Sequence, residues 1–203
     1  MRPIATMLLL GSLLLLGACT SGGDDTGQGF VGGSGSVSFE PDEREPAPDV
    51  SAETLEGEEL ALDDHEGIVV LNFWASWCGP CAREAPDLVA THEAYADRGV
   101  DLLGVNVRDS RANARSFERD FDKPYPSWFD DASTIAADFG DIGPEALPTT
   151  IIIDEDRRVA SRFFGRVTAD QLADRLDELL DEAAARTPAS GERAPAAAGS
   201  GQP

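Results

Sequence analysis

The chain has 203 residues, of which 41% are hydrophobic. This is enough for the core of one ordinary domain with appendages, and too much for wholesale disorder. Its formal net charge is −22, and such an acidic surface repels phosphate backbones, so we exclude DNA and RNA as partners. We interpret the acidity as a solubility feature of the surface.

The N-terminus carries the pattern of an export signal, with a charge at Arg2 and an apolar stretch over residues 4–16. That stretch is shorter than the ~20 residues of a membrane-spanning helix, so we predict a signal peptide over residues 1–18. The segment Leu16-Gly17-Ala18-Cys19 resembles the lipobox of bacterial lipoproteins. This resemblance implies that Cys19 is lipidated and anchors the protein to the outer side of the cell membrane. The alternative is an ordinary signal peptide with an incidental cysteine.

The predicted folded domain spans residues 46–186. The segment before it, residues 19–45, is rich in Gly, Ser and Asp without hydrophobic periodicity, which indicates a flexible tether. We assign no role to Phe39, an isolated apolar residue in this tether. Residues 187–203 are mostly Pro, Ala, Gly and Ser and are predicted to be a disordered tail.

The domain begins with a predicted hairpin that turns at Glu56-Gly57. Apolar, β-branched strands then alternate with amphipathic helices, and a second hairpin and a helix capped by Thr168 follow. The predicted strands are 68–74, 100–107, 127–129, 147–154 and 158–164, and the predicted helices are 82–98, 110–121, 132–139 and the segment after Thr168. This order indicates an α/β fold with a mixed central sheet flanked by helices.

Two cysteines lie where the first buried strand gives way to a helix. Cys78 and Cys81 are separated by two residues, so they can close a small disulfide. The first turn of a helix has unpaired N–H groups and the positive end of the dipole, which favour a thiolate over a thiol. The pattern therefore predicts a reversible dithiol–disulfide site.

The segment Phe73-Trp74-Ala75-Ser76-Trp77-Cys78-Gly79-Pro80-Cys81 resembles the active-site segment of thioredoxins. Pro86 matches the helix-kinking proline of that family, and Pro148 before Thr149-Thr150 resembles its cis-proline strand. The N-terminal hairpin, Glu84-Ala85-Pro86 and a central insertion at about 109–130 are similar to the membrane-anchored, extracytoplasmic TlpA/ResA branch. The resemblance covers residues 46–185 and implies a thioredoxin-like fold.

This resemblance implies a division of labour between the two thiols. Cys78 would be the attacking thiolate that forms a mixed disulfide with substrate, and Cys81 would resolve it. Pro148 is expected to be cis, with the Leu147 backbone offered to an extended substrate segment. The residues expected to contact substrate are Trp77, Gly79, Pro80, Leu147 and Pro148.

Resolution requires Cys81 to lose a proton. Glu84 lies three residues further along the same helix face and is the candidate catalytic acceptor, although a solvated or helix-pairing carboxylate is the alternative. Thioredoxins carry a buried aspartate where this chain has Asn72, which cannot take a proton. This departure favours Glu84, and Asn72 is expected to form local hydrogen bonds.

We therefore expect an extracytoplasmic thiol-disulfide oxidoreductase that reduces protein disulfides and receives electrons from a membrane thiol donor. The resemblance suggests apocytochrome c as the substrate class, and Gly79-Pro80 matches strongly reducing thioredoxins, whose potential is about −270 mV. No metal or organic cofactor is expected, because His65 and His92 do not form a metal set with the cysteines. The alternatives are a copper chaperone on the same fold, a peroxidase of the same superfamily and a structural disulfide.

Overall fold

The computed structural model describes residues 35–140 and 146–186. The predicted signal peptide, Cys19 with the first part of the predicted tether, and the predicted C-terminal tail lie outside these ranges. Within them, no helix combines the length and the apolar character that crossing a bilayer requires.

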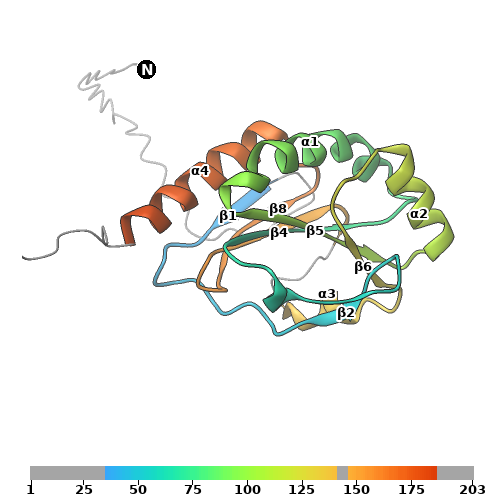
Figure 1. The fold of residues 1–203 in the computed structure, drawn as a ribbon, viewed down its shortest axis with the longest axis horizontal. Coiled ribbons are helices and arrows are strands. Elements are labelled where there is room, and N and C mark those ends of the chain that lie inside the picture. Colours follow the sequence, from blue (N-terminus) through green and yellow to red (C-terminus); the bar gives the residue numbers. More distant parts are fainter. Residues whose placement is uncertain (1–34, 141–145, 187–203) are drawn as a thin grey trace, which may run out of the picture. The chain divides into compact units, whose positions relative to one another are not determined.

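A six-stranded mixed sheet forms the centre of the domain, in the order β1-β8-β7-β4-β5-β6 (Figure 1). Its strands are β1 (Gly35–Ser38), β4 (Ile68–Trp74), β5 (Val100–Val107), β6 (Ser127–Asp130), β7 (Thr149–Ile153) and β8 (Val159–Phe164). Strand β4 pairs in parallel with β5 and β5 in parallel with β6, whereas the pairs of β4 with β7, β7 with β8 and β1 with β8 are antiparallel. The predicted mixed sheet is therefore confirmed.

The predicted N-terminal hairpin forms a separate two-stranded sheet from β2 (Ser51–Glu53) and β3 (Glu59–Ala61). The helices are α1 (Gly79–Tyr95), α2 (Arg111–Asp120), α3 (Thr134–Asp138) and α4 (Ala169–Arg186), with short 3₁₀ turns at Leu62–Asp64 and Ala96–Arg98. Helices α1, α2 and α4 lie on one side of the central sheet, and α3 and the hairpin lie on the other (Figure 1).

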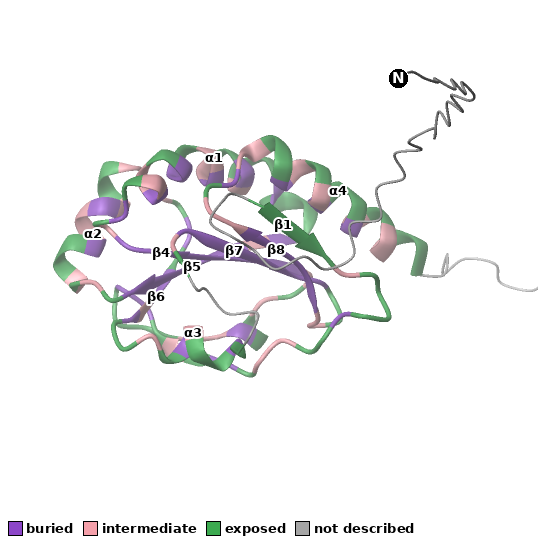
Figure 2. Ribbon diagram, turned by 180° about the vertical axis from the view of Figure 1, so that it is seen from behind, coloured by how far each residue is buried: buried purple, intermediate pink, exposed green. Residues whose placement is uncertain are grey.

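The alternation of side chains along β4 divides the core between the two faces of the sheet. Val69, Leu71 and Phe73 pack toward the α3 side, whereas Ile68 and Val70 pack with side chains of α1 and α4. Both sets are buried, as the purple strands of Figure 2 show. The sheet is thus covered on both faces, which explains why its central strands read as continuous apolar runs.

The ordered domain begins earlier than the sequence predicts. β1 lies within the predicted tether but pairs antiparallel with β8, Phe39 packs against the core, and the Arg44 side chain is 1% exposed. The predicted boundary at residue 46 is therefore wrong, as is the assignment of no role to Phe39. All four residues of β1 are exposed, and the strand is held at the sheet edge by main-chain hydrogen bonds, so it carries no apolar alternation that would reveal it.

Candidate active site

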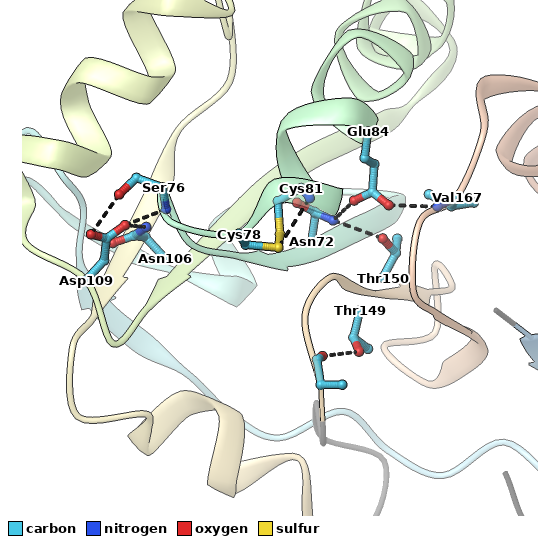
Figure 3. Close-up of a disulfide and its surroundings, with 11 residues drawn as sticks. Asn72, Ser76, Cys78, Cys81, Glu84, Asn106, Asp109, Thr149, Thr150 and Val167 are labelled. Atoms are coloured by element: carbon cyan, nitrogen blue, oxygen red, sulfur yellow. Dashed lines mark hydrogen bonds between the residues drawn. A yellow bond between two sulfur atoms is a disulfide. The ribbon is translucent and has the colours of Figure 1, made fainter. Parts of the chain in front are cut away.

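Cys78 and Cys81 form a disulfide where β4 gives way to α1 (Figure 3). The S–S distance is 2.10 Å, the Cα atoms are 5.2 Å apart, and both side chains are buried. They share a small apolar cluster with Trp74 and Phe117, which places the tryptophan before the motif and helix α2 against the redox pair.

Cys78 is the N-cap of α1. Its sulfur accepts a hydrogen bond from the backbone N–H of Cys81 over 3.2 Å, and Pro80 stands in the first turn, where a missing N–H costs nothing. The Cys78 sulfur therefore lies at the positive end of the helix dipole. This is the position at which a thiolate is stabilised once the disulfide is reduced.

The surface around the disulfide contains an exposed aromatic side chain. Trp77 is 59% exposed, and its indole N–H donates to the carbonyl oxygen of Arg108 over 3.0 Å. The Leu147–Pro148 peptide bond is cis, as predicted, and directly precedes β7. Leu147 is half-buried and packs against the cluster that holds the cysteines, so the fold brings this segment to the redox pair across some seventy residues of sequence.

Glu84 is buried behind the motif, with 1% of its surface exposed. One carboxylate oxygen accepts a hydrogen bond of 2.6 Å from the side-chain amide of Asn72. The other accepts a hydrogen bond of 2.7 Å from the backbone N–H of Val167 (Figure 3). The Asn72 amide also donates to the Thr150 hydroxyl over 3.0 Å. Asn72 forms hydrogen bonds as predicted, but its partners are 12 and 78 residues away and not local. The burial of Glu84 excludes a solvated carboxylate.

Burial raises the pKa of Glu84 to about 7, although the hydrogen bonds from Val167 and Asn72 favour the ionised form. A carboxyl group with this pKa can accept or release a proton near neutral pH. Such a group is what deprotonation of Cys81 on the same helix requires, and its role stays a prediction.

A second carboxylate, that of Asp109, holds the motif, and the sequence did not reveal it. It accepts hydrogen bonds from the Ser76 backbone N–H over 2.6 Å, the Ser76 hydroxyl over 2.9 Å and the Asn106 amide over 3.1 Å. Partial burial alone would raise the pKa of Asp109, but these bonds hold it below its ordinary value. The carboxylate thus fastens the residues before Cys78 to the loop after β5.

Lys123, the single lysine of the chain, also supports the site, and no pattern in the sequence signals this. Its ammonium group is buried 4.1 Å from the centroid of the Trp74 ring and donates to the Ser127 hydroxyl over 3.1 Å. Burial lowers the pKa of Lys123 to about 8. The Trp74 ring packs against Phe117 at 4.6 Å, so both contacts support the tryptophan beside the cysteines.

The side-chain contacts of the two histidines are with residues other than the redox cysteines. His65 hydrogen-bonds to Asp101 over 2.9 Å, and His92 packs against the Tyr125 ring at 5.6 Å. In the described ranges, no three His, Cys, Asp or Glu side chains gather in a way that could hold a metal ion.

Comparison with known proteins places this site in a family. The sequence model of the AhpC/TSA family matches residues 44–162. Thiol-disulfide oxidoreductase ResA of Geobacillus thermodenitrificans is 35% identical over 134 residues, which cover 66% of this chain and 75% of ResA. The thioredoxin-like protein YneN of Bacillus subtilis is 34% identical over 139 residues, covering 66% of this chain and 79% of YneN.

Solved structures give the same result. A DsbF homologue from Corynebacterium diphtheriae is 36% identical with a TM-score of 0.68, covering 71% of this chain and 92% of the homologue. A secreted thiol-disulfide isomerase from Corynebacterium glutamicum is 34% identical with a TM-score of 0.69, covering 72% and 92%. These likenesses confirm the predicted thioredoxin-like fold and the predicted activity class. The chain therefore belongs to the AhpC/TSA family, as a thioredoxin-like thiol-disulfide oxidoreductase.

Proposed function

We propose that this protein is a lipid-anchored oxidoreductase that reduces protein disulfides outside the cytoplasm through the Cys78–Cys81 pair. The observation that carries the proposal is the disulfide at the N-terminus of α1 with the buried, protonatable Glu84 on the same helix. The first feature supplies an activated nucleophile, and the second supplies an acceptor for the proton of the resolving thiol.

The reaction begins with the reduced protein. The Cys78 thiolate attacks one sulfur of a substrate disulfide, a Cys78–substrate bond forms, and the other substrate sulfur leaves and takes up a proton. The Cys81 thiol passes its proton to the Glu84 carboxylate and attacks the Cys78 sulfur. The second substrate sulfur is released and receives a proton. Two electrons reach the substrate, and the protein ends with the Cys78–Cys81 disulfide.

The substrate segment would lie across the surface beside the disulfide. We assign its contacts to Trp77, Gly79, Pro80, Leu147 and Pro148. The exposure of Trp77 supports this assignment, because a large solvent-facing aromatic ring beside a reactive disulfide offers apolar contact to a partner. The half-buried Leu147 packs against the cysteine cluster and would present its backbone to an extended chain.

The location and partners follow from chemistry and from the resemblance to known proteins. A dithiol outside the cytoplasm is reoxidised with every turnover, so a membrane thiol donor must return electrons to it. The lipobox-like segment at Cys19 supports a membrane anchor, and the resemblance to the TlpA/ResA branch supports apocytochrome c as one protein substrate. No organic or metal cofactor enters the reaction as written.

The test combines the reduction potential of Cys78–Cys81 with turnover of a model protein disulfide, using a Cys78→Ser variant as the inactive control. We expect a potential near that of thioredoxin, about −270 mV, with turnover that the control lacks. A potential well below about −300 mV without turnover would indicate a structural bridge. Stoichiometric copper retention without turnover would indicate a metal chaperone. If the Cys19→Ala variant still partitioned into the detergent phase, the proposed lipid anchor on Cys19 would be wrong.

A further inference from the structure

We propose that Arg83 and Arg108 form a cationic docking rim beside the disulfide, and that this rim binds acidic segments of the substrate protein. The inference rests on the proposed function and extends it by naming the charge of the segment that approaches Cys78. Neither arginine has a part in the chemistry described above.

Arg83 places its guanidinium group next to Gly79, the residue that follows the attacking cysteine. It lies on α1, and its side chain is exposed. A Cβ atom built on Gly79, the residue that follows Cys78, would lie 3.8 Å from the Nη1 atom of Arg83. The charged group therefore lies beside a residue that we assign to substrate contact.

The backbone of Arg108 borders the same site from the loop between β5 and α2. Its side chain is exposed, and its φ angle of 48° is one that residues other than glycine seldom adopt. Its carbonyl oxygen accepts the Trp77 indole N–H, and the next residue, Asp109, accepts both donors of Ser76. The loop thus fixes the Arg108 backbone beside the exposed tryptophan.

The charges of Arg83 and Arg108 have no carboxylate partner among the described residues, although the chain is acidic. The chain has 38 Asp and Glu against 16 Lys and Arg. Seven other arginines of the described ranges pair with carboxylates, whereas Arg115, Arg119 and Arg158 do not; the seven are Arg44, Arg98, Arg111, Arg157, Arg166, Arg175 and Arg186. Arg83 and Arg108 form no ion pair with any residue that the structure describes. Their charges therefore remain available to a partner.

A partner with carboxylates next to its disulfide fits this rim. Guanidinium groups bind carboxylates through paired hydrogen bonds. Charges farther apart than about 8 Å are largely screened at physiological ionic strength, so the distant acidic surface contributes little to the binding of a docked segment. The rim would select acidic substrates that the net charge of the chain would otherwise repel.

The experiment uses three peptides with the same internal disulfide, flanked by Glu, Gln or Lys, and the full-length reduced protein. We expect kcat/KM for the Glu peptide to be about fivefold higher than for the Lys peptide. This preference should arise from a lower KM, and added salt should reduce it. The variant Arg83→Gln/Arg108→Gln should abolish this preference and retain activity on the Gln peptide. Arg186→Gln is the matched control, because its ion pair lies at the turn after β7, at the far end of that strand from Pro148.

A second readout separates this inference from the proposed function. Serine-substituted Glu and Lys peptides are titrated into the oxidised protein, which measures docking without chemistry. If the protein binds the Glu peptide preferentially and the double variant does not, the rim is supported, even if turnover is absent. Absence of turnover would count against the proposed oxidoreductase function but not against the rim. Equal binding and equal turnover of the two peptides would overturn the rim. So would a double variant that retains the preference, or one whose only change is a raised pKa of Cys78.

Discussion

The side-chain amide of Asn72 donates a hydrogen bond of 2.6 Å to the carboxylate of Glu84. Thioredoxins carry their buried acid on the strand; here the strand supplies a neutral donor and helix α1 supplies the acid. Since an amide cannot take up a proton, Glu84 is the member of this hydrogen-bonded pair that titrates. The pair thus holds a carboxyl group at a fixed place behind the disulfide, with its pKa near neutrality.

The first prediction concerns the kinetics of resolution. In Glu84→Gln, the Cys81 thiol loses its proton acceptor, so release of substrate from the mixed disulfide should slow by about 10²-fold or more. The dependence of that step on a group with a pKa of about 7 should also disappear. Rapid-mixing measurements at about five pH values between about pH 5 and pH 9 follow the release of substrate from the mixed disulfide directly.

Glu93→Gln is the matched control for this measurement, because Glu93 is an exposed carboxylate on the same helix. It should leave the pH profile unchanged. A Glu84→Gln protein with the wild-type profile would remove Glu84 from the proton path.

The second prediction concerns the stability of the oxidised protein. The pKa of Glu84 is raised from 4.5 to about 7 in the folded state, so the folded protein binds a proton there that the unfolded chain releases. The associated stability is fully present below about pH 4.5 and is lost as the pH rises through 7, by about 3 kcal/mol. Glu84→Gln should abolish this part of the pH dependence. Urea unfolding at acidic and neutral pH gives the free energy of unfolding of both proteins. If this free energy changed equally with pH in the two proteins, the raised pKa of Glu84 would be contradicted.

Much of the fold was predictable because the signals are local. The β-branched runs gave β4 and β5 with their observed ends, and the Cys78–Cys81 spacing at a helix start identified the redox pair. The placement of Pro148 opposite that pair came from resemblance to a family, because nothing local to it signals a contact across seventy residues.

The features that escaped prediction depend on distant partners. β1 gains its structure from main-chain pairing with β8, in which Ser38 lies opposite Ser161, 123 residues away. The tie between Asp109 and Ser76 and the packing of Lys123 on Trp74 likewise join segments that only the folded chain brings together. Polar residues of this kind look like surface in the sequence, since their burial is offset by partners that sequence patterns do not name.

The third prediction tests the earlier domain start. Arg44 is buried and forms ion pairs with Asp154 at 3.0 Å and with Glu182 at 2.8 Å. Arg44→Ala leaves the Asp154 carboxylate, 3% exposed, without its cation, so it should destabilise the protein by about 3–5 kcal/mol. Urea unfolding measures the change. Arg186→Ala, which breaks exposed ion pairs, should change the stability little. If the two substitutions changed the free energy of unfolding equally, the residues before 46 would be a tether and not part of the folded domain.

The fourth prediction concerns the buried ammonium group of Lys123. Its pKa falls from 10.5 in the unfolded chain to about 8 in the folded protein, because burial disfavours the charge against attraction by Glu118. The folded protein therefore binds fewer protons than the unfolded chain between these values, and stability should rise with pH across that window, by up to about 3 kcal/mol. Lys123→Met removes the titrating group while filling similar space against the Trp74 ring, so the variant should lack this rise. Unfolding of both proteins in urea from about pH 7.5 to pH 9.5 keeps the measurement below the range in which tyrosines ionise. A rise of equal size in Lys123→Met would assign the pH dependence to other groups.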